Sequence, residues 1–167
     1  MNKTIEIVPI DELDVRILEQ LQADASLTNH ELALRVHASA PTCLRRVRRL
    51  RDTGVIEKQV AIVNPERLGN TLTAIIEITL DVQTAENLEA FEKRAMAESA
   101  ILQCYRVSQG PDFIVVAQVA DMPAYHAMAY RTFTSDANVR NVRSFFSIHR
   151  SKFETRMPIT FSASSES

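Results

Sequence analysis

The spacing of the apolar residues changes at Gly54, and this change limits the folds that the chain can adopt. Before Gly54, apolar residues recur at intervals of three and four, which is the period of a helix that buries one face. After it, β-branched or alternating runs are separated by two more helical stretches. A chain of 167 residues can hold one large domain or two small ones. The pattern therefore predicts a small helical domain followed by an α+β domain.

The N-terminal third is predicted to form three short helices. Asp11 can cap the first helix, and Thr28 with Glu31 forms a capping box at the start of the second. Ser39 can cap the third helix, which ends at Gly54. Helices this short cannot each form a core alone, so we expect them to pack as a trihelical unit.

The third helix is strongly basic, although the chain as a whole has a formal net charge of −2. Its arginines are Arg45, Arg46, Arg48, Arg49 and Arg51. On a wheel of about 100° per residue, the arc expected to be buried holds Cys43, Leu44, Val47 and Leu50. Arg45 and Arg49 lie almost opposite that arc, with Thr42 beside them. One face of this helix is therefore predicted to be buried and the other to be cationic.

A cationic third helix after a three-residue turn is typical of a helix-turn-helix, whose recognition helix enters the major groove of DNA. Arginine suits this task because its planar fork pairs with phosphate or with guanine. The alternative, a basic helix face that contacts only solvent, is less favoured at this place in a trihelical unit. The candidate DNA-binding residues are Thr42, Arg45, Arg46, Arg48 and Arg49. Among them, Arg48 is expected on phosphates or on the protein surface, and the others in the major groove.

From Leu72 onward, the pattern predicts the order strand, helix, strand, strand, helix, strand. The strands are expected in residues 72–80, 101–108, 112–119 and 139–153. This is the ferredoxin-like βαββαβ arrangement, in which both helices cover one face of the sheet. Apolar residues on the other face, such as Ile75, indicate a partner subunit.

These predictions divide the chain into four parts. They are a winged helix-turn-helix domain (1–56), a linker strand and turn (57–70), a βαββαβ domain for effector sensing and oligomerisation (71–154), and a C-terminal tail (155–167). The wing and linker strand are expected in VIEKQVAIV, residues 55–63, because this segment is β-branched. The fold class is therefore α+β, with a winged helix-turn-helix followed by a ferredoxin-like sandwich.

The sequence contains no pattern typical of an enzyme, a metal site or a membrane span. Its four histidines lack metal-ligand spacing, its two cysteines are isolated, and three glycines can hardly build a dinucleotide-binding loop. No apolar run approaches the roughly 20 residues of a membrane helix, and the N-terminus does not resemble a signal peptide. We therefore expect a cytoplasmic protein that is not an enzyme and that needs no cofactor.

Two segments resemble the leucine-responsive regulator/AsnC (Lrp/AsnC) family of bacterial and archaeal transcription factors. They are residues 10–36 and 38–69, and their most specific elements are LDVRIL, LRRVRRL with DTGVI, and NPERLG. The βαββαβ half is similar to the effector-sensing domain of that family, so the resemblance covers about residues 10–153. It implies a sandwich that dimerises through its sheet, dimers that assemble into tetramers or octamers, and small molecules, usually amino acids, bound between dimers.

Two places depart from the family pattern. His37 stands where the family usually has glycine before the recognition helix. Where the family usually shows Thr-Gly, two residues and Asp, this chain has Ser108, Gln109, Gly110, Pro111 and Asp112.

The candidate effector-binding residues are Ser108, Gln109, Gly110, Asp112 and Ser144. The Asp112 carboxylate can bind the ammonium group of an amino acid. Backbone N–H groups of the turn and the Ser144 hydroxyl, on a strand expected to lie next to it, can bind the carboxylate. The alternative is that Asp112 is simply a turn residue after proline.

Together these features predict a sequence-specific, DNA-binding transcriptional regulator. We expect a homodimer as the minimum unit, a tetramer or octamer at working concentration, and modulation of assembly or DNA affinity by a small amino-acid-like effector. The alternative is a metabolite-binding or assembly module that controls an enzyme by direct contact, and the arginines of the third helix argue against it.

Overall fold

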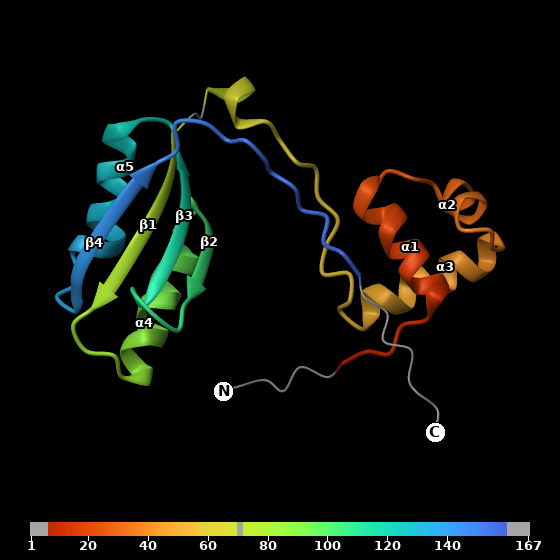
Figure 1. Ribbon diagram of the computed structural model, residues 1–167, viewed down its shortest axis with the longest axis horizontal. Helices are drawn as coiled ribbons and strands as arrows, with labels where there is room; N and C mark the ends of the chain where they lie inside the picture. Colours follow the sequence, from red (N-terminus) through yellow and green to blue (C-terminus); the bar gives the residue numbers. More distant parts are fainter. Residues whose placement is uncertain (1–6, 70–71, 160–167) are drawn as a thin grey trace. The chain divides into compact units, whose positions relative to one another are not determined.

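The computed structural model describes residues 7–69 and 72–159, and the chain divides into two compact units (Figure 1). The first unit contains the N-terminal segment up to Ile62 together with the C-terminal segment from Lys152. The second unit runs from Val63 to Ser151. The chain therefore passes twice between the units. The described part of the expected tail, residues 155–159, belongs to the first unit, and its remainder lies outside the described residues.

The first unit is built on three helices, as predicted. They are α1 (Glu12–Ala23), α2 (Asn29–Arg35) and α3 (Ala40–Asp52). Each begins at the predicted residue, because the side chains of Asp11, Thr28 and Ser39 accept hydrogen bonds from the N–H three residues later. The first two of these caps are complete capping boxes.

The helices share one apolar core. Its buried residues are Ile17, Leu18, Leu32, Ala33, Val36, Cys43, Val47 and Leu50. Ile159 of the C-terminal segment packs against this core. Leu44 is 41% exposed, so its expected burial was wrong. Only Cys43, Val47 and Leu50 of α3 are buried. The side of α3 that contacts the core is therefore narrower than the predicted arc.

No strand forms in residues 55–63 of the described chain, which corrects the predicted wing and linker strand. Val60, Ile62 and Val63 are each at least 60% exposed. A strand must exchange hydrogen bonds with a neighbouring strand, and none of the described segments pairs with this one. The predicted turn that follows contains a 3₁₀ helix, η1 (Pro65–Leu68), capped by Asn64.

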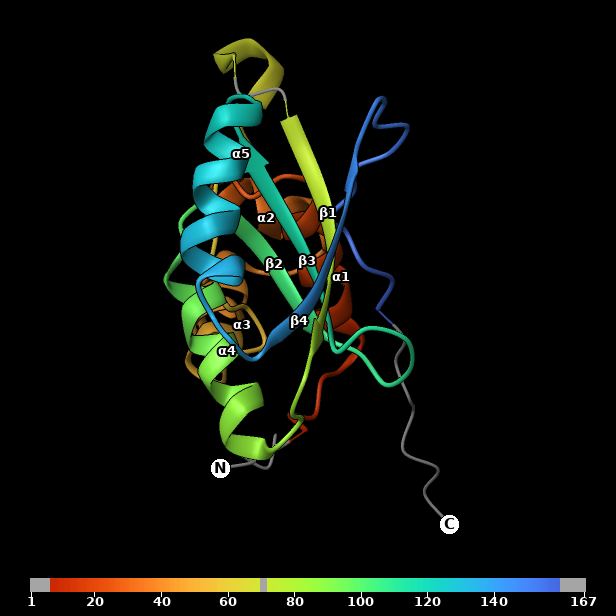
Figure 2. The ribbon, with the colours of Figure 1, turned by 90° about the vertical axis from the view of Figure 1, so that its left-hand side faces the viewer.

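The second unit has the predicted βαββαβ order. Its elements are β1 (Leu72–Leu80), α4 (Ala85–Ala97), β2 (Ile101–Arg106), β3 (Phe113–Val119), α5 (Met122–Ala129) with the π-helical turn η2 (Tyr130–Thr134), and β4 (Val139–Phe146). The sheet is antiparallel, with strand order β2-β3-β1-β4. Both α4 and α5 lie on one face of it (Figure 2). The last strand is shorter than predicted and ends at Phe146.

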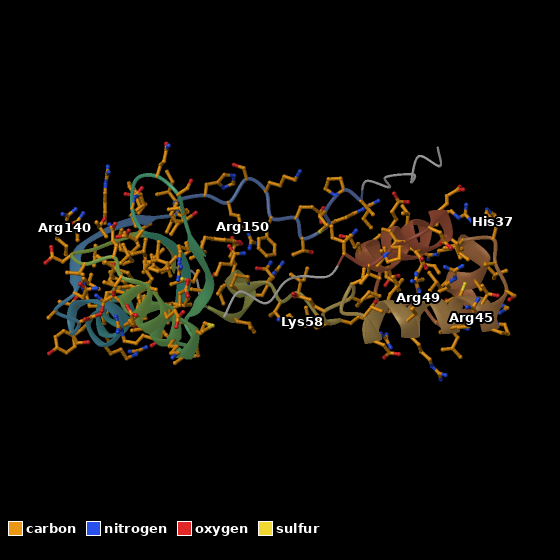
Figure 3. All side chains as sticks on the ribbon, turned by 90° about the horizontal axis from the view of Figure 1, so that it is seen from below. His37, Arg45, Arg49, Lys58, Arg140 and Arg150 are labelled. Carbon is orange, nitrogen blue, oxygen red and sulfur yellow. The ribbon has the colours of Figure 1, made fainter. Side chains whose placement is uncertain are left out.

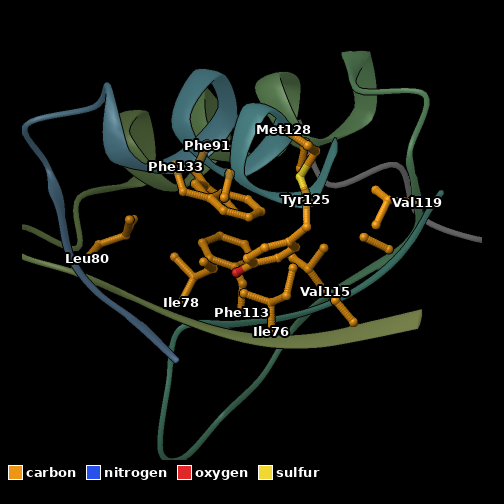
Figure 4. Packing of buried hydrophobic residues seen from close by; sticks show 14 residues of the cluster. Ile76, Ile78, Leu80, Phe91, Phe113, Val115, Val119, Tyr125, Met128 and Phe133 are labelled. Atoms are coloured by element: carbon orange, nitrogen blue, oxygen red, sulfur yellow. The ribbon is translucent and has the colours of Figure 1, made fainter. Parts of the chain in front are cut away.

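The core of this unit lies between the two helices and the sheet (Figure 4). Ile76, Ile78 and Leu80 of β1 point into it, as the alternation predicted. Phe91 of α4 stacks on Phe113 of β3, with ring centroids 4.5 Å apart. On the other face of the sheet, Ile75 of β1 and Phe145 of β4 are each 42% exposed, so the described residues leave that face uncovered.

Candidate DNA-binding and effector sites

A buried carboxylate holds α3 against α1. Asp14, in the first turn of α1, has no exposed surface. Its Oδ2 accepts a hydrogen bond from Arg46 Nη1 at 3.2 Å and another from Arg49 Nη2. Arg46 Nη1 also lies 2.6 Å from Asp11 Oδ2, and Arg49 Nη1 donates to the Pro9 carbonyl at 3.2 Å. Two of the five arginines are therefore bound to the N-terminal end of α1.

These contacts give Arg46 and Arg49 partners within the chain that the sequence analysis did not expect. Both were predicted to face the major groove, but their side chains are only 23% and 36% exposed and are engaged by Asp14. The wheel placed the apolar residues of α3 and took no account of an acidic partner on another helix. A buried carboxylate requires cations nearby, because an unpaired buried charge is very costly.

The pKa values around this cluster reflect the same pairing. The hydrogen bond from the Asp14 backbone N–H and the neighbouring Arg46 guanidinium lower the pKa of Asp11. The hydrogen bond to Asp11, with the charge of Asp14, raises the pKa of Arg46. Asp11 and Arg46 are therefore both charged at neutral pH.

The side of α3 that faces away from the core carries Arg45 and Arg48, which we call the exposed arginine face. Both side chains are exposed, and neither forms an ion pair with the described part of the chain. Figure 3 shows Arg45 and Arg49 on the same helix. Thr42 is half-buried, and its hydroxyl shares a hydrogen bond with that of Ser39 at 2.8 Å. Arg51, the fifth arginine, is exposed and donates a hydrogen bond from Nη2 to Gln59 Oε1. The structure thus leaves Arg45 and Arg48, two of the five, available to a ligand.

Asp14 is the partner of Arg46 and Arg49 that the sequence analysis missed. The signal was present, because Asp14 lies three and four residues before Ile17 and Leu18, on the apolar stripe of α1. A charged residue on a buried stripe indicates a partner elsewhere in the fold.

The turn between α2 and α3 is closed by His37 in a left-handed conformation, with φ of 55°. The Ala38 N–H donates to the Ala33 carbonyl at 3.0 Å, and the His37 N–H to the Leu34 carbonyl at 3.4 Å. This is a Schellman motif, in which glycine is the preferred residue at the position of His37. The departure seen in the sequence therefore falls on a strained backbone position.

The candidate effector residues are not all brought together. The turn 108–112 joins β2, an edge strand, to β3. β4 pairs with β1, where Ser144 lies opposite Ile76. The Ser144 hydroxyl is hydrogen-bonded to the Tyr125 hydroxyl, and β1 separates it from Asp112. Strand order decides this, and Ser144 is therefore not next to the turn.

Asp112 fastens the turn to the end of β1. Its Oδ2 accepts a hydrogen bond from the Leu80 N–H at 2.6 Å, and its own N–H donates to the Ile78 carbonyl at 2.8 Å. Gly110 has φ of 89°, and Ser108 and Gln109 are exposed beside it. One carboxylate oxygen of Asp112 thus has a structural role.

A polar hollow of about 80 Å³ lies at the opposite end of the sheet. It is lined by Pro65, Glu66, Thr73, Gln118, Ser147, Ile148, His149 and Arg150. The hollow brings Glu66 and Arg150 to one surface. The sequence analysis did not predict it, because its residues come from four separate segments of the chain.

In residues 7–69 and 72–159, no group of three or more His, Cys, Asp or Glu side chains suits a metal ion. No helix in the same ranges is both long and apolar enough to cross a membrane. Cys43 and Cys104 are free thiols, and burial raises the pKa of each.

Both units match known protein families. Residues 10–57 match the family model described as winged helix-turn-helix DNA-binding. Residues 73–157 match the model described as the Lrp/AsnC ligand binding domain.

Similar proteins cover nearly the whole chain. It is 36% identical over 146 residues to an uncharacterized HTH-type transcriptional regulator of Haemophilus influenzae, covering 87% of each chain. It is also 36% identical over 145 residues to the leucine-responsive regulatory protein of Rhizobium meliloti, covering 87% of this chain and 93% of that one. Among solved structures, a transcriptional regulator of Neisseria meningitidis in complex with L-Met is 30% identical, with a TM-score of 0.82 over 89% of this chain and 96% of that one.

Proposed function

The chain belongs to the Lrp/AsnC family of transcriptional regulators, and we propose that its exposed arginine face contacts operator DNA while its second unit binds a small amino-acid-like effector. The family assignment makes it a transcriptional regulator with a DNA-binding helix-turn-helix and a ligand-binding domain. The proposal concerns the residues that carry out these tasks.

The observation that carries the DNA-binding proposal is the division of the arginines on α3. Arg45 and Arg48 are exposed on the side away from the core, whereas Arg46 and Arg49 are held by Asp14. An arginine that already has a carboxylate partner must lose it before it can pair with a phosphate or a base. Arg45 and Arg48 therefore contact DNA, and Thr42, one turn earlier on α3, lies where a recognition helix meets base edges.

Fluorescence anisotropy with DNA from upstream of the protein's own gene tests this. We expect Arg45→Ala or Arg48→Ala to weaken binding by about 1–3 kcal/mol if the residue reads a base, and to relax specificity at one position. A phosphate contact would instead weaken all sequences alike and reduce the salt dependence. Arg16→Ala, an exposed arginine paired with Glu12 on α1, is the control. Wild-type affinity in both α3 variants would show that this face does not bind DNA.

We propose that the uncovered face of the sheet forms a homodimer, and that dimers associate further into a tetramer or octamer. Ile75 lies between Phe145 and Val116 in the strand register, so an apolar row crosses this face. Ile75 and Phe145 are each 42% exposed in the single chain. A partner sheet would bury them. Two linked helix-turn-helix units also gain affinity by binding two half-sites.

Light scattering at micromolar concentration tests this assembly. We expect Ile75→Lys to shift the population toward monomer, because it places charge in the apolar row. Met96→Lys is the control, since Met96 is 75% exposed on α4, which covers the other face. A wild-type monomer, or equal assembly of the two variants, contradicts the proposed interface.

The effector proposal places the ammonium of an amino-acid-like molecule at Asp112, within the turn 108–112. A carboxylate oxygen can accept more than one hydrogen bond, so the contact with Leu80 leaves capacity for a ligand. The ligand-binding family model over this unit supports a small effector, and the Neisseria relative was solved with L-Met.

Isothermal titration calorimetry against the twenty amino acids tests the site. Asp112→Asn keeps an acceptor for the Leu80 N–H but removes the charge, so we expect binding to weaken by roughly ten- to a hundredfold. Glu66→Gln in the polar hollow is the matched control. If Glu66→Gln weakens binding and Asp112→Asn does not, the effector lies in the hollow and the Asp112 proposal is wrong.

A further inference from the structure

We infer that Asp14 is a positioning residue for DNA recognition, which holds Arg46 and Arg49 against α1 so that α3 presents only Arg45 and Arg48 to DNA. The inference rests on the proposed contact between the exposed arginine face and DNA. It assigns a role in specificity to a residue that is fully buried and does not itself touch DNA.

The contacts make Asp14 the centre of the attachment between the two helices. One oxygen, Oδ2, accepts from both Arg46 and Arg49 of α3. The same oxygen accepts from the Asp11 N–H at 3.2 Å, which closes the capping box of α1. The orientation of α3 is therefore tied, through a single atom, to the first turn of α1.

Replacing a buried ion pair with well-packed apolar side chains is often neutral or stabilising, so stability does not require a charge at this position. Asp14 lies on the apolar stripe of α1, where an apolar side chain would pack without any cost of burying a charge. Buried polar atoms that have no hydrogen-bond partner among the described residues include Asp14 Oδ1 and the Nε atoms of Arg46 and Arg49. A charged cluster with unmet hydrogen bonds is poorly explained by stability alone. A pair of directional contacts to α3 does explain it, because guanidinium–carboxylate geometry sets the rotation of the helix.

The cluster also limits the free charge of α3. Each arginine that contacts a phosphate adds to affinity for any DNA sequence, and steepens the dependence of binding on salt. Holding two of the five arginines of α3 on Asp14 keeps them out of that sequence-independent attraction. The preference for the operator over other DNA is therefore expected to depend on Asp14.

The decisive comparison is between Asp14→Asn and Asp52→Asn. Both remove one negative charge from the helix-turn-helix, but Asp52 is exposed on α3 and forms no ion pair with the described chain. If charge alone matters, both variants bind operator more tightly and keep the wild-type ratio of operator to random-DNA affinity. If Asp14 positions α3, Asp14→Asn lowers that ratio by about tenfold or more. The slope of log affinity against log salt concentration also becomes steeper, by the equivalent of up to about two phosphate contacts. Asp52→Asn keeps the ratio.

A second variant keeps the inference testable if Asp14→Asn does not fold, which circular dichroism would reveal. Arg49→Gln removes an arginine that Asp14 holds and leaves Arg46 in place. If Arg49 acts through Asp14, the salt slope stays at the wild-type value while the operator preference falls. A slope reduced by about one contact would place Arg49 on a phosphate and overturn the inference.

The two proposals fail in different ways. Wild-type protein with no operator preference refutes the DNA-binding proposal and the inference together. Wild-type protein that prefers its operator, with Asp14→Asn folded and equally selective, refutes only the role of Asp14.

Discussion

Gln22 on α1 is hydrogen-bonded through both ends of its carboxamide to the backbone of Met157. Its Nε2 donates to the Met157 carbonyl at 3.0 Å, and its Oε1 accepts from the Met157 N–H at 2.8 Å. The two residues are 135 positions apart in the sequence. Together with the packing of Ile159 against the core of the helices, this pairing makes the C-terminal segment part of the DNA-binding unit.

Removing this pairing is expected to destabilise the first unit selectively. Gln22→Ala loses two hydrogen bonds in an exposed setting, which should lower the free energy of unfolding by about 1 kcal/mol. Truncation after Ser151 also exposes apolar surface that Ile159 covers, and should cost about 1–2 kcal/mol more. Urea unfolding monitored by circular dichroism measures both. Gln20→Ala on the same helix is the control, and an equal effect there would show that the pairing contributes nothing.

His37→Gly is expected to stabilise the helix-turn-helix by about 0.5–1 kcal/mol. A left-handed conformation is costly for a side chain with a Cβ atom and is not for glycine, although glycine also has greater entropy to lose on folding. His37→Ala keeps the backbone cost while removing the imidazole, so it should not stabilise. Thermal denaturation of both variants separates the two effects. Stabilisation by alanine as well as glycine would show that the imidazole, not the backbone, is unfavourable.

The arginines of α3 should differ sharply in their effect on folding. Arg46→Ala removes hydrogen bonds to Asp11 and to the buried Asp14, so we expect a loss of about 1–3 kcal/mol in the free energy of unfolding. Arg45→Ala removes no hydrogen bond or ion pair within the described part of the chain and should change that free energy by less than about 0.5 kcal/mol. Chemical denaturation without DNA gives both values. Similar values for the two variants would contradict the division between held and exposed arginines.

Acid is expected to destabilise the first unit through its capping boxes. The backbone hydrogen bond from Asp14 lowers the pKa of Asp11, and the hydrogen bond from the Thr28 hydroxyl lowers the pKa of Glu31. Because both pKa values fall on folding, the stabilisation is present above the ordinary values of 3.8 and 4.5 and is lost as the pH drops through the folded values. Urea unfolding at pH 7, 5, 4 and 3 should show the loss.

The double variant Asp11→Asn, Glu31→Gln is the control for this pH dependence. It should be less stable than wild type at pH 7 and should lose less between pH 5 and pH 3. If it loses as much as wild type over that range, other carboxylates control the acid response.

The helix starts, the element order and the buried face of β1 could all be predicted from the amino-acid sequence. These depend on contacts between residues close along the chain, such as the cap from Thr28 to Glu31, or on the period of side chains along one element. The prediction of a strand in residues 55–63 was wrong. β-branched composition indicates a local preference for extended backbone, but it does not supply the neighbouring strand that a sheet requires.

Which charged groups are free to bind a ligand depends on long-range contacts in the folded chain. Asp14 meets Arg49 across 35 positions, and Asp112 meets the Leu80 N–H across 32. An arginine side chain is long and flexible, so it can extend in several directions from one position on a helix. Its direction depends on which opposite charge lies close to it in the folded chain. The separation of Arg45 from Arg49 on one helix is therefore a property of the packing between α1 and α3, and not of the spacing of the arginines.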